Sequence, residues 1–134
     1  MMFQERASYA EFRANQMMTL IKWRPYIEKI NRRYKTLRTF DDIARDVELN
    51  NLIFLHNDEA FALLYIDNRA LGKIVHIWQA GGSPRGLAQL EQGVIEFARS
   101  IDARQITALG RSGFTKWQHG TLKATGQRQF AMEL

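Results

Sequence analysis

Cysteine is missing from this 134-residue chain. Disulfides, zinc–thiolate sites, iron–sulfur clusters and thiolate nucleophiles are therefore all excluded. Long apolar runs are missing too, because the longest, Ala60–Ile66, is much shorter than the about 20 residues that a membrane span needs. The first residues, Met1–Arg6, lack the apolar core of a signal peptide. We therefore expect a cytoplasmic protein with no membrane contact.

Metal-binding motifs are also missing. The three histidines, His56, His76 and His119, show neither Glu-x-x-His nor His-x-x-x-His spacing, so no metal site is predicted. With two prolines, nine glycines and 46% hydrophobic residues, the chain is neither collagen-like nor disordered. Its length and composition predict a single domain over residues 1–134.

Acidic residues are scarce in the second half of the chain. The net charge is +5, and residues 1–67 contain ten Lys/Arg and ten Asp/Glu, whereas residues 68–134 contain nine and four. This excess indicates a C-terminal half that faces an anionic partner, such as a phosphorylated ligand or a nucleic-acid backbone. Ordinary solvated surface charge is the alternative.

A basic run lies in the first half. It contains four cations around one aromatic residue: Arg32, Arg33, Tyr34, Lys35 and Arg38. Such a run could meet nucleic acid through phosphate contacts and stacking. Three acidic residues follow shortly after and balance it: Asp41, Asp42 and Asp46. We therefore interpret the run as a solvated helix face, and nucleic acid is not an expected partner.

Helical spacing dominates the first fifty residues. Ser8 and Glu11 match a capping box. Pro25 predicts the start of a second helix, whose apolar positions continue to Leu37. Thr39 is suited to cap a third helix. An apolar stripe at helical spacing runs along the first helix: Ala10, Ala14, Met17, Met18 and Ile21. Residues 1–50 are therefore predicted to be mainly helical.

From Leu52 the spacing becomes that of strands. Three segments rich in branched and aromatic residues predict an antiparallel meander: Leu52–His56, Ala60–Ile66 and Lys73–Trp78. A glycine-rich loop, Gly81–Gly86, then leads into a helix over residues 86–101. Three further elements follow, a strand, a short helix and a closing strand: Arg104–Leu109, Gly110–Trp117 and Gln127–Leu134. Residues 51–134 thus predict a mixed sheet with a parallel crossover, in an α/β or α+β fold.

The glycine-rich loop is the most informative feature. Its glycines let backbone N–H groups turn toward a ligand, the helix that follows adds the positive end of its dipole, and Arg85 adds a cation. The loop is neither a Walker A sequence nor a dinucleotide fingerprint. It therefore indicates an anion site of another kind, with a plain strand-to-helix turn as the alternative.

The order of the elements and the loop together resemble the GNAT superfamily of acyl-CoA-dependent N-acetyltransferases. That family's loop reads Gln/Arg-x-x-Gly-x-Gly/Ala, and this chain matches it at Gly86 and Ala88 but has Ser83 at the first position. The resemblance extends over roughly residues 40–134 and is closest to small GNAT-like proteins of tailed bacteriophages. Three stretches carry that second likeness: Gln79–Gly82, Glu96–Arg99 and Gly110–Phe114.

The resemblance implies a GNAT-like mixed central sheet flanked by helices, with acetyl-CoA as cosubstrate. Backbone N–H groups from Gly82 to Ala88 would hold the pyrophosphate, Arg85 would screen its charge, and the pantetheine arm would extend along the preceding strand. The implied cofactor-binding residues are Ile77, Trp78, Gln79, Gly81, Gly82, Ser83, Arg85, Gly86, Leu87 and Ala88.

Acyl transfer to an amine also needs a base for the amine and an acid for the leaving thiolate. Many GNAT proteins use a tyrosine as that acid, but residues 113–120, which correspond to its position, contain none. His119 is the substitute there, with a plain surface histidine as the alternative. His76 is a second candidate or a hydrogen-bonded core residue. Glu59 is a carboxylate for the amine or a solvated turn residue.

Three functions remain open. The first is an acyl-CoA-binding domain that acetylates an amine by direct transfer, because no cysteine can carry the acyl group. The second is a catalytically inactive GNAT-fold phage protein, either a virion or morphogenesis component or a host-interaction protein, which the missing tyrosine and Ser83 favour. The third is a nucleic-acid-binding α/β domain. The expected partners are acyl-CoA, an amine-bearing acceptor or protein, and further copies of the chain, in the host cytoplasm or the virion.

Overall fold

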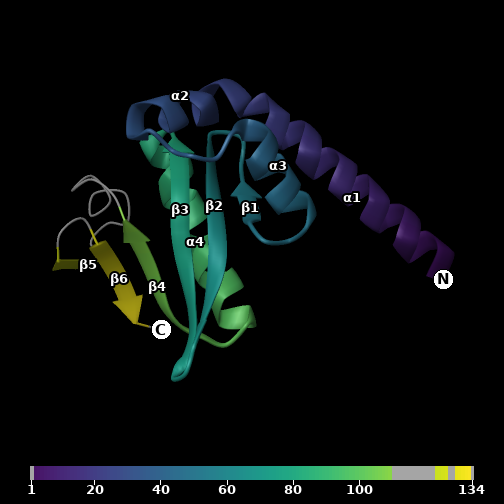
Figure 1. Cartoon of the computed structure of the whole chain (residues 1–134). Coiled ribbons are helices and arrows are strands. Elements are labelled where there is room, and N and C mark those ends of the chain that lie inside the picture. The colour runs from purple at the N-terminus through teal and green to yellow at the C-terminus, as the bar shows by residue number, and fades with distance from the viewer. Residues whose placement is uncertain (1, 110–122, 127–128, 134) are drawn as a thin grey trace. The chain divides into compact units, whose positions relative to one another are not determined.

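The computed structural model describes residues 2–109, 123–126 and 129–133, with side chains described for residues 11–108. The elements in chain order are α1 (Met2–Lys22), α2 (Arg24–Tyr34), α3 (Phe40–Glu48), β1 (Ile53–His56), β2 (Ala60–Arg69), β3 (Gly72–Gly82), α4 (Pro84–Ser100), β4 (Ala103–Leu109), β5 (Lys123–Gly126) and β6 (Gln129–Glu133) (Figure 1). They divide into two compact units, residues 1–54 and 55–134.

The first unit is a group of three contacting helices. Leu20, Ile27 and Ile43 are fully buried, one from each helix. Pro25 lies in the first turn of α2, as predicted. Lys35 ends that helix in a left-handed conformation with φ 51°. This ending overturns the prediction that the helix continues to Leu37, whose side chain is 99% exposed.

Two other helix predictions need correction. The first helix begins at Met2, so Ser8 lies inside it and does not cap it. Residues with good helix propensity precede Ser8 and extend the helix toward the N-terminus. The apolar stripe predicted on one face of this helix is not its buried side, because Ala14, Met18 and Ile21 are exposed, whereas Leu20 is buried.

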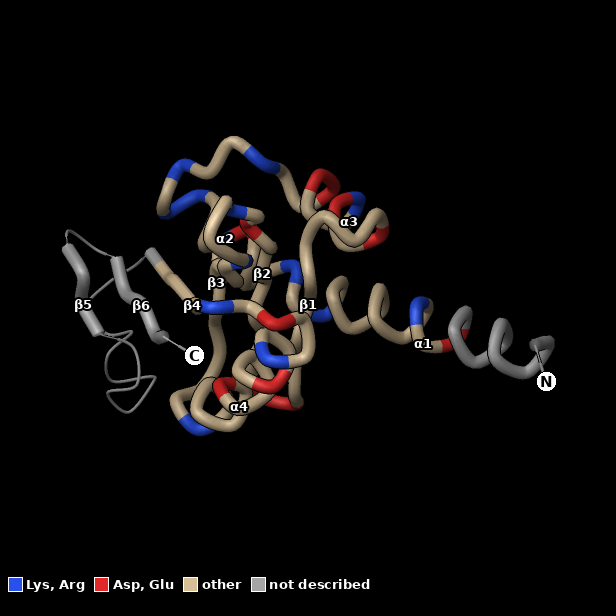
Figure 2. The backbone as a smooth tube through the Cα atoms, turned by 90° about the horizontal axis from the view of Figure 1, so that it is seen from below, with Lys and Arg blue, Asp and Glu red and all other residues tan. Residues whose placement is uncertain are grey.

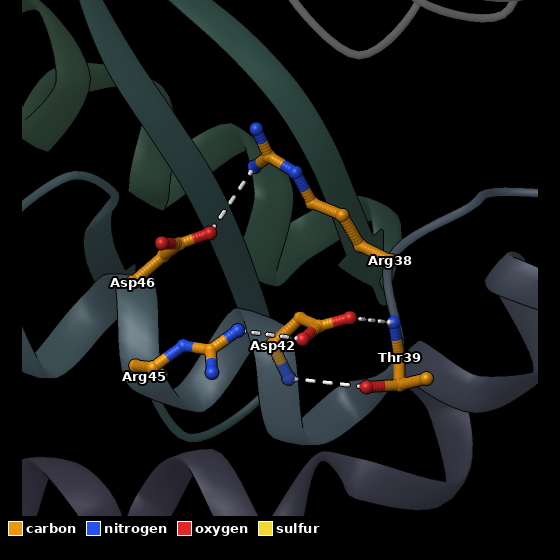
Figure 3. A network of polar contacts seen from close by, with 5 residues as sticks. All are labelled: Arg38, Thr39, Asp42, Arg45 and Asp46. Atoms are coloured by element: carbon orange, nitrogen blue, oxygen red, sulfur yellow. Dashed lines mark hydrogen bonds and ion pairs between the residues drawn. The ribbon is translucent and has the colours of Figure 1, made fainter.

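The start of α3 confirms the predicted cap. Thr39 Oγ1 accepts a hydrogen bond from the backbone N–H of Asp42 at 3.1 Å, and the Asp42 carboxylate accepts one from the Thr39 N–H at 3.0 Å (Figure 3). Asp42 also forms an ion pair with Arg45 at 2.8 Å. The helix therefore begins with a complete capping box, which satisfies two N–H groups that no helical carbonyl reaches.

The second unit contains a mixed sheet. The six strands lie in the order β1-β2-β3-β4-β6-β5. The pair β2 and β3 is antiparallel, β3 and β4 are parallel, and β6 is antiparallel to both β4 and β5. The predicted fold class, a mixed sheet flanked by helices, is confirmed, and so is the parallel pairing across α4. Only β5 was not predicted, because Lys123–Gly126 contains a single apolar residue, Ala124.

Helix α4 contacts β2, β3 and β4 and runs along one face of the sheet (Figure 1). Its buried residues recur at helical spacing, at Gly86, Leu90, Val94 and Ala98. Apolar strand residues are buried in the same unit: Phe61, Leu63, Val75, Ile77, Ile106 and Ala108. Burial of this apolar surface is the main source of stability for the unit.

The glycine-rich segment is not the loop that the sequence predicts. Strand β3 continues through Gly81 and Gly82, and α4 begins at Pro84, so Ser83 alone connects them. The turn between β2 and β3 is also short, with Ala70 and Leu71 between the strand ends. Pairing with β2, which reaches Ala60–Gly82, keeps the glycines in the strand.

Candidate functional site

The site is built where the parallel strands β3 and β4 stop pairing. Their register runs from Lys73–Ala103 to Ile77–Ala108. Strand β3 continues for five more residues, to Gly82, and pairs there only with β2 among the described strands. The edge of β3 that faces β4 is therefore not covered by described strand pairing from Trp78 onward. This is the arrangement expected where a ligand lies along a strand end.

A bulge in β3 accompanies this change. Leu63 pairs with Gln79 and Leu64 pairs with Ile77, so Trp78 is the extra residue. A bulge bends its strand and re-aims the side chains on either side. Gln79, which follows it, is buried. Ile77, Trp78 and Gln79, the residues proposed to lie along the pantetheine arm, therefore form the bulged part of the strand.

The junction between β3 and α4 packs closely on the start of β2. A Cβ atom added at Gly82, whose φ is +128°, would lie 2.2 Å from the Glu59 carbonyl oxygen. A Cβ atom at Gly86 would lie 2.6 Å from Glu59 Cβ. Both glycines are therefore required by packing. The close packing at Gly82 supports the strand-to-helix-turn interpretation for that glycine, and Gly81 takes part as a strand residue.

Hydrogen bonds hold this junction in place. Asn57 Nδ2 donates to the Gly86 carbonyl oxygen at 2.8 Å, and Asn57 Oδ1 accepts from the Glu59 N–H at 2.9 Å. The Ser83 N–H donates to the Glu59 carbonyl oxygen at 2.9 Å. The role of Asn57 in holding the start of α4 could not be predicted from the sequence, because an asparagine between two strands indicates only that a turn is present.

Ser83 is the N-cap of α4. Its Oγ accepts a hydrogen bond from the Gly86 N–H at 3.0 Å, and its carbonyl oxygen accepts from the Leu87 N–H at 2.9 Å. Pro84 has no N–H group. Several donors that the resemblance assigns to a pyrophosphate thus have partners within the chain, and Ala88 lies further along the same helix.

Arg85 and Glu59 lie side by side at this helix start. Arg85 Nε is 3.8 Å from Glu59 Oε2, with side chains 80% and 45% exposed. An exposed pair at this distance adds little to stability. Arg85 can therefore reorient toward an anionic ligand, while Glu59 opposes one.

His76 lies at the other end of the site, one residue before the pairing of β3 with β4 ends. Its Nδ1 is 2.7 Å from Thr107 Oγ1, and its ring centroid is 4.8 Å from that of Tyr65. Burial lowers the pKa of His76 below its ordinary value, and the negative charge of Asp67 partly opposes this. His76 is therefore a neutral, hydrogen-bonded residue at neutral pH.

Tyr65, His76 and Thr107 form a row across three strands, because each is the register partner of the next. Tyr65 and Thr107 were missed as neighbours of His76, since the sequence does not contain the register. Glu59 and His76 belong to opposite ends of the site. Leu64 pairs with Ile77, and the five residue-to-residue steps from Glu59 to Leu64 span about 16 Å at strand spacing.

His119 and the stretch Gly110–Phe114 lie outside the described residues. Within residues 11–108, no group of three metal-ligating side chains occurs. In the described part of the chain, no helix has both the length and the hydropathy that a bilayer span requires.

Comparison with solved structures identifies the fold. One similar structure is described as a probable acetyltransferase, with a TM-score of 0.64 and 12% identity over 80% of this chain and 85% of that one. A second is an acetyltransferase of the GNAT family from Listeria monocytogenes 4b F2365, with a TM-score of 0.51 and 10% identity over 90% and 87%. No protein-family model and no curated protein matches the sequence. The chain therefore has a GNAT-like fold.

Proposed function

We propose that this chain binds an acyl-CoA along the end of β3 and the first turn of α4, and that it transfers the acyl group to an amine. One observation carries the proposal: pairing between β3 and β4 ends at Ile77–Ala108, whereas β3 continues to Gly82 and leads directly into α4. The GNAT-like fold of the similar acetyltransferases supports it. The pantetheine arm would follow β3 past Trp78, and the pyrophosphate would lie at Arg85.

The pyrophosphate end can be tested through Arg85. Its charge and the helix dipole both favour an anion at the start of α4. Acetyl-CoA should raise the melting temperature of the wild-type protein, because a ligand that binds only the folded state stabilises it. Arg85→Ala should weaken binding about tenfold, which corresponds to about 1.4 kcal/mol. Arg99→Ala removes the same side chain from the other end of α4 and should bind like wild type.

Ser83 provides a sharper test. In Ser83→Ala the Gly86 N–H loses its side-chain acceptor, which should lower stability by about 1 kcal/mol. A bound phosphate can then accept from that N–H group. Acetyl-CoA should therefore stabilise Ser83→Ala more than wild type. An equal or smaller gain contradicts a phosphate at this helix start.

Glu59 has a different proposed role from the one that the sequence suggests. It lies beside Arg85 and about 16 Å along the sheet from the level of Ile77, so its charge acts on the pyrophosphate end. Glu59→Gln should therefore tighten acetyl-CoA binding and leave kcat unchanged. A fall in kcat with unchanged acetyl-CoA binding would instead support Glu59 as the carboxylate that serves the amine.

His76 is the candidate acid–base group at the acyl end. In direct transfer the amine nitrogen attacks the thioester carbon, the carbon–sulfur bond breaks, the amine loses a proton and the thiolate gains one. A neutral imidazole with a lowered pKa can accept the amine proton near neutral pH. His76→Gln should lower kcat with little change in KM for acetyl-CoA, and should remove the acidic limb of the pH–rate profile.

A catalytically inactive GNAT-fold protein is the second candidate function. The capped Gly86 N–H and the missing N–H at Pro84 favour it, because both reduce the donors available to a pyrophosphate. In that case the domain would act in a phage particle, in its assembly or on a host protein. Release of free thiol from acetyl-CoA across a panel of amines separates the two functions. Turnover supports the enzyme, and absence of turnover with every amine supports the second function.

A further inference from the structure

The outward face of α2 carries three cations at adjacent positions. Lys29, Arg32 and Arg33 follow one another at i, i+3 and i+4 and are all exposed, with Tyr26 one turn earlier. Ile27, on the opposite side of the helix, is fully buried. Figure 2 shows Lys and Arg positions along the end of α2 and the following segment, while Asp and Glu positions gather on α3. We call Tyr26, Lys29, Arg32 and Arg33 the basic face.

The neighbouring acidic residues do not neutralise this face. Asp42 binds Thr39 and Arg45, and Asp46 lies 3.6 Å from Arg38 (Figure 3). Within residues 11–108, no carboxylate is in ion-pair distance of Lys29, Arg32 or Arg33. The sequence predicts that the three acidic residues balance the basic run. Among the cations of that run, only Arg38 forms an ion pair with one of them within residues 11–108.

Local stability does not account for the face. Like charges three and four residues apart on a helix repel one another. The helix dipole favours cations in the last turn, which covers Arg32 and Arg33. It does not cover Lys29, in the middle of the helix. Tyr26 is 41% exposed, and its ring contacts that of Trp23 edge-on with centroids 5.9 Å apart. Residues 22–38 contain seven Lys/Arg and one Asp/Glu, although the whole chain has a net charge of only +5.

We propose that the basic face binds single-stranded nucleic acid. The three cations would contact successive phosphates, and Tyr26 would stack on an unpaired base. An anionic membrane fits less well, because an interfacial helix inserts an apolar face, and the apolar side of α2 is buried at Ile27. Two exposed aliphatic residues near the helix, Ile21 and Leu37, both lie outside it. This inference uses residues of the first unit and is independent of acyl-CoA binding.

The experiment measures fluorescence anisotropy of a labelled single-stranded oligonucleotide of roughly 20 nucleotides, a length that covers one binding site. The test variant is Lys29→Gln/Arg32→Gln/Arg33→Gln. The control, Arg69→Gln/Lys73→Gln/Arg99→Gln, removes three exposed cations from the second unit and gives the same net charge. Wild type and control should bind the oligonucleotide with similar affinity and with the same steep dependence of log K on log salt concentration. In the test variant this slope should be smaller by about 2, because each of the three lost phosphate contacts contributes about 0.7.

Circular dichroism first confirms that both variants are folded. Tyr26→Leu should then weaken binding to the single strand more than binding to the matching duplex, because stacking needs an unpaired base. Equal losses in the test and control variants would show a net-charge effect and overturn the proposal. Absence of binding by wild type at low salt overturns it too, as does binding only to vesicles that contain phosphatidylserine.

Discussion

Asn57 Nδ2 donates a hydrogen bond to the Gly86 carbonyl oxygen across 2.8 Å, and so joins the turn before β2 to the first turn of α4. The same side chain accepts from the Glu59 N–H, and the Glu59 carbonyl oxygen accepts from the Ser83 N–H. The start of α4, where we place the pyrophosphate, is therefore fixed by the turn Asn57–Glu59. Substitutions in this turn should affect both stability and ligand binding.

Asn57→Ala should lower the free energy of unfolding by about 2 kcal/mol, because two hydrogen bonds are lost and the Gly86 carbonyl loses its side-chain donor. Asn57→Asp keeps the acceptor for Glu59 but places a carboxylate oxygen against that carbonyl, so it should be at least as destabilising. Asn68→Ala, at an exposed strand position, is the matched control and should change little. Urea unfolding measures all three, and equal stability of Asn57→Ala and wild type would contradict the role.

Alanine should destabilise the protein at Gly82 and Gly86 and stabilise it at Gly93. Gly82→Ala combines a positive φ with a Cβ 2.2 Å from the Glu59 oxygen, and Gly86→Ala places a Cβ 2.6 Å from Glu59 Cβ. Both should lose about 2–4 kcal/mol. A Cβ at Gly93 meets nothing within 4 Å, so Gly93→Ala should gain about 0.5–1 kcal/mol from helix propensity. Thermal unfolding of the three variants tests this prediction: the melting temperature should be highest for Gly93→Ala, intermediate for wild type and lowest for Gly82→Ala and Gly86→Ala.

Stability should fall as the solution becomes acidic because of His76. Burial lowers its folded-state pKa, so the unfolded state binds a proton more readily. The stability that neutral His76 contributes is fully present above the ordinary histidine pKa. It is lost as the pH falls from there toward the lowered pKa of the folded state. His76→Gln should flatten this part of the stability–pH curve. An NMR titration that gives His76 a pKa at or above the ordinary value would contradict the account.

The cap of α3 should also be measurable. Thr39→Ala removes the hydroxyl that accepts from the Asp42 N–H and should cost about 1 kcal/mol. Thr36→Ala, three residues earlier in the segment before the helix, is the control. The Thr39 N–H and, to a smaller extent, the Thr39 side chain lower the pKa of Asp42. Thr39→Ala keeps the N–H and loses the side-chain contribution, so the acid-induced loss of stability should become smaller but remain. Guanidinium unfolding at two pH values tests both statements.

The sequence predicted those features that short-range chemistry determines. Thr39 and Asp42 are three residues apart, so their capping box is visible in the sequence alone. The change from helical to alternating spacing at Leu52 likewise marks the beginning of the strands. The parallel pairing of β3 with β4 follows from a strand–helix–strand order.

Features that depend on register and packing could not be predicted. Tyr65 and Thr107 meet His76 only because of how β2, β3 and β4 align. Gly82 remains in a strand because it pairs with Ala60, the first residue of β2, whereas the glycine-rich composition of residues 81–86 indicates a loop. Leu37 fits a helical stripe, yet the left-handed Lys35 ends the helix first. In each case a partner or a backbone angle outweighs the local pattern.

The most direct test is an NMR titration of the uniformly labelled protein with coenzyme A. The central claim predicts that the amide signals of Trp78, Gln79 and Arg85 shift together, and that those of α2 stay in place. The Gly86 signal should shift most in Ser83→Ala, where its N–H has lost its side-chain acceptor. A titration that shifts none of the signals at the end of β3 and the start of α4, or shifts only those of α2, would contradict the claim.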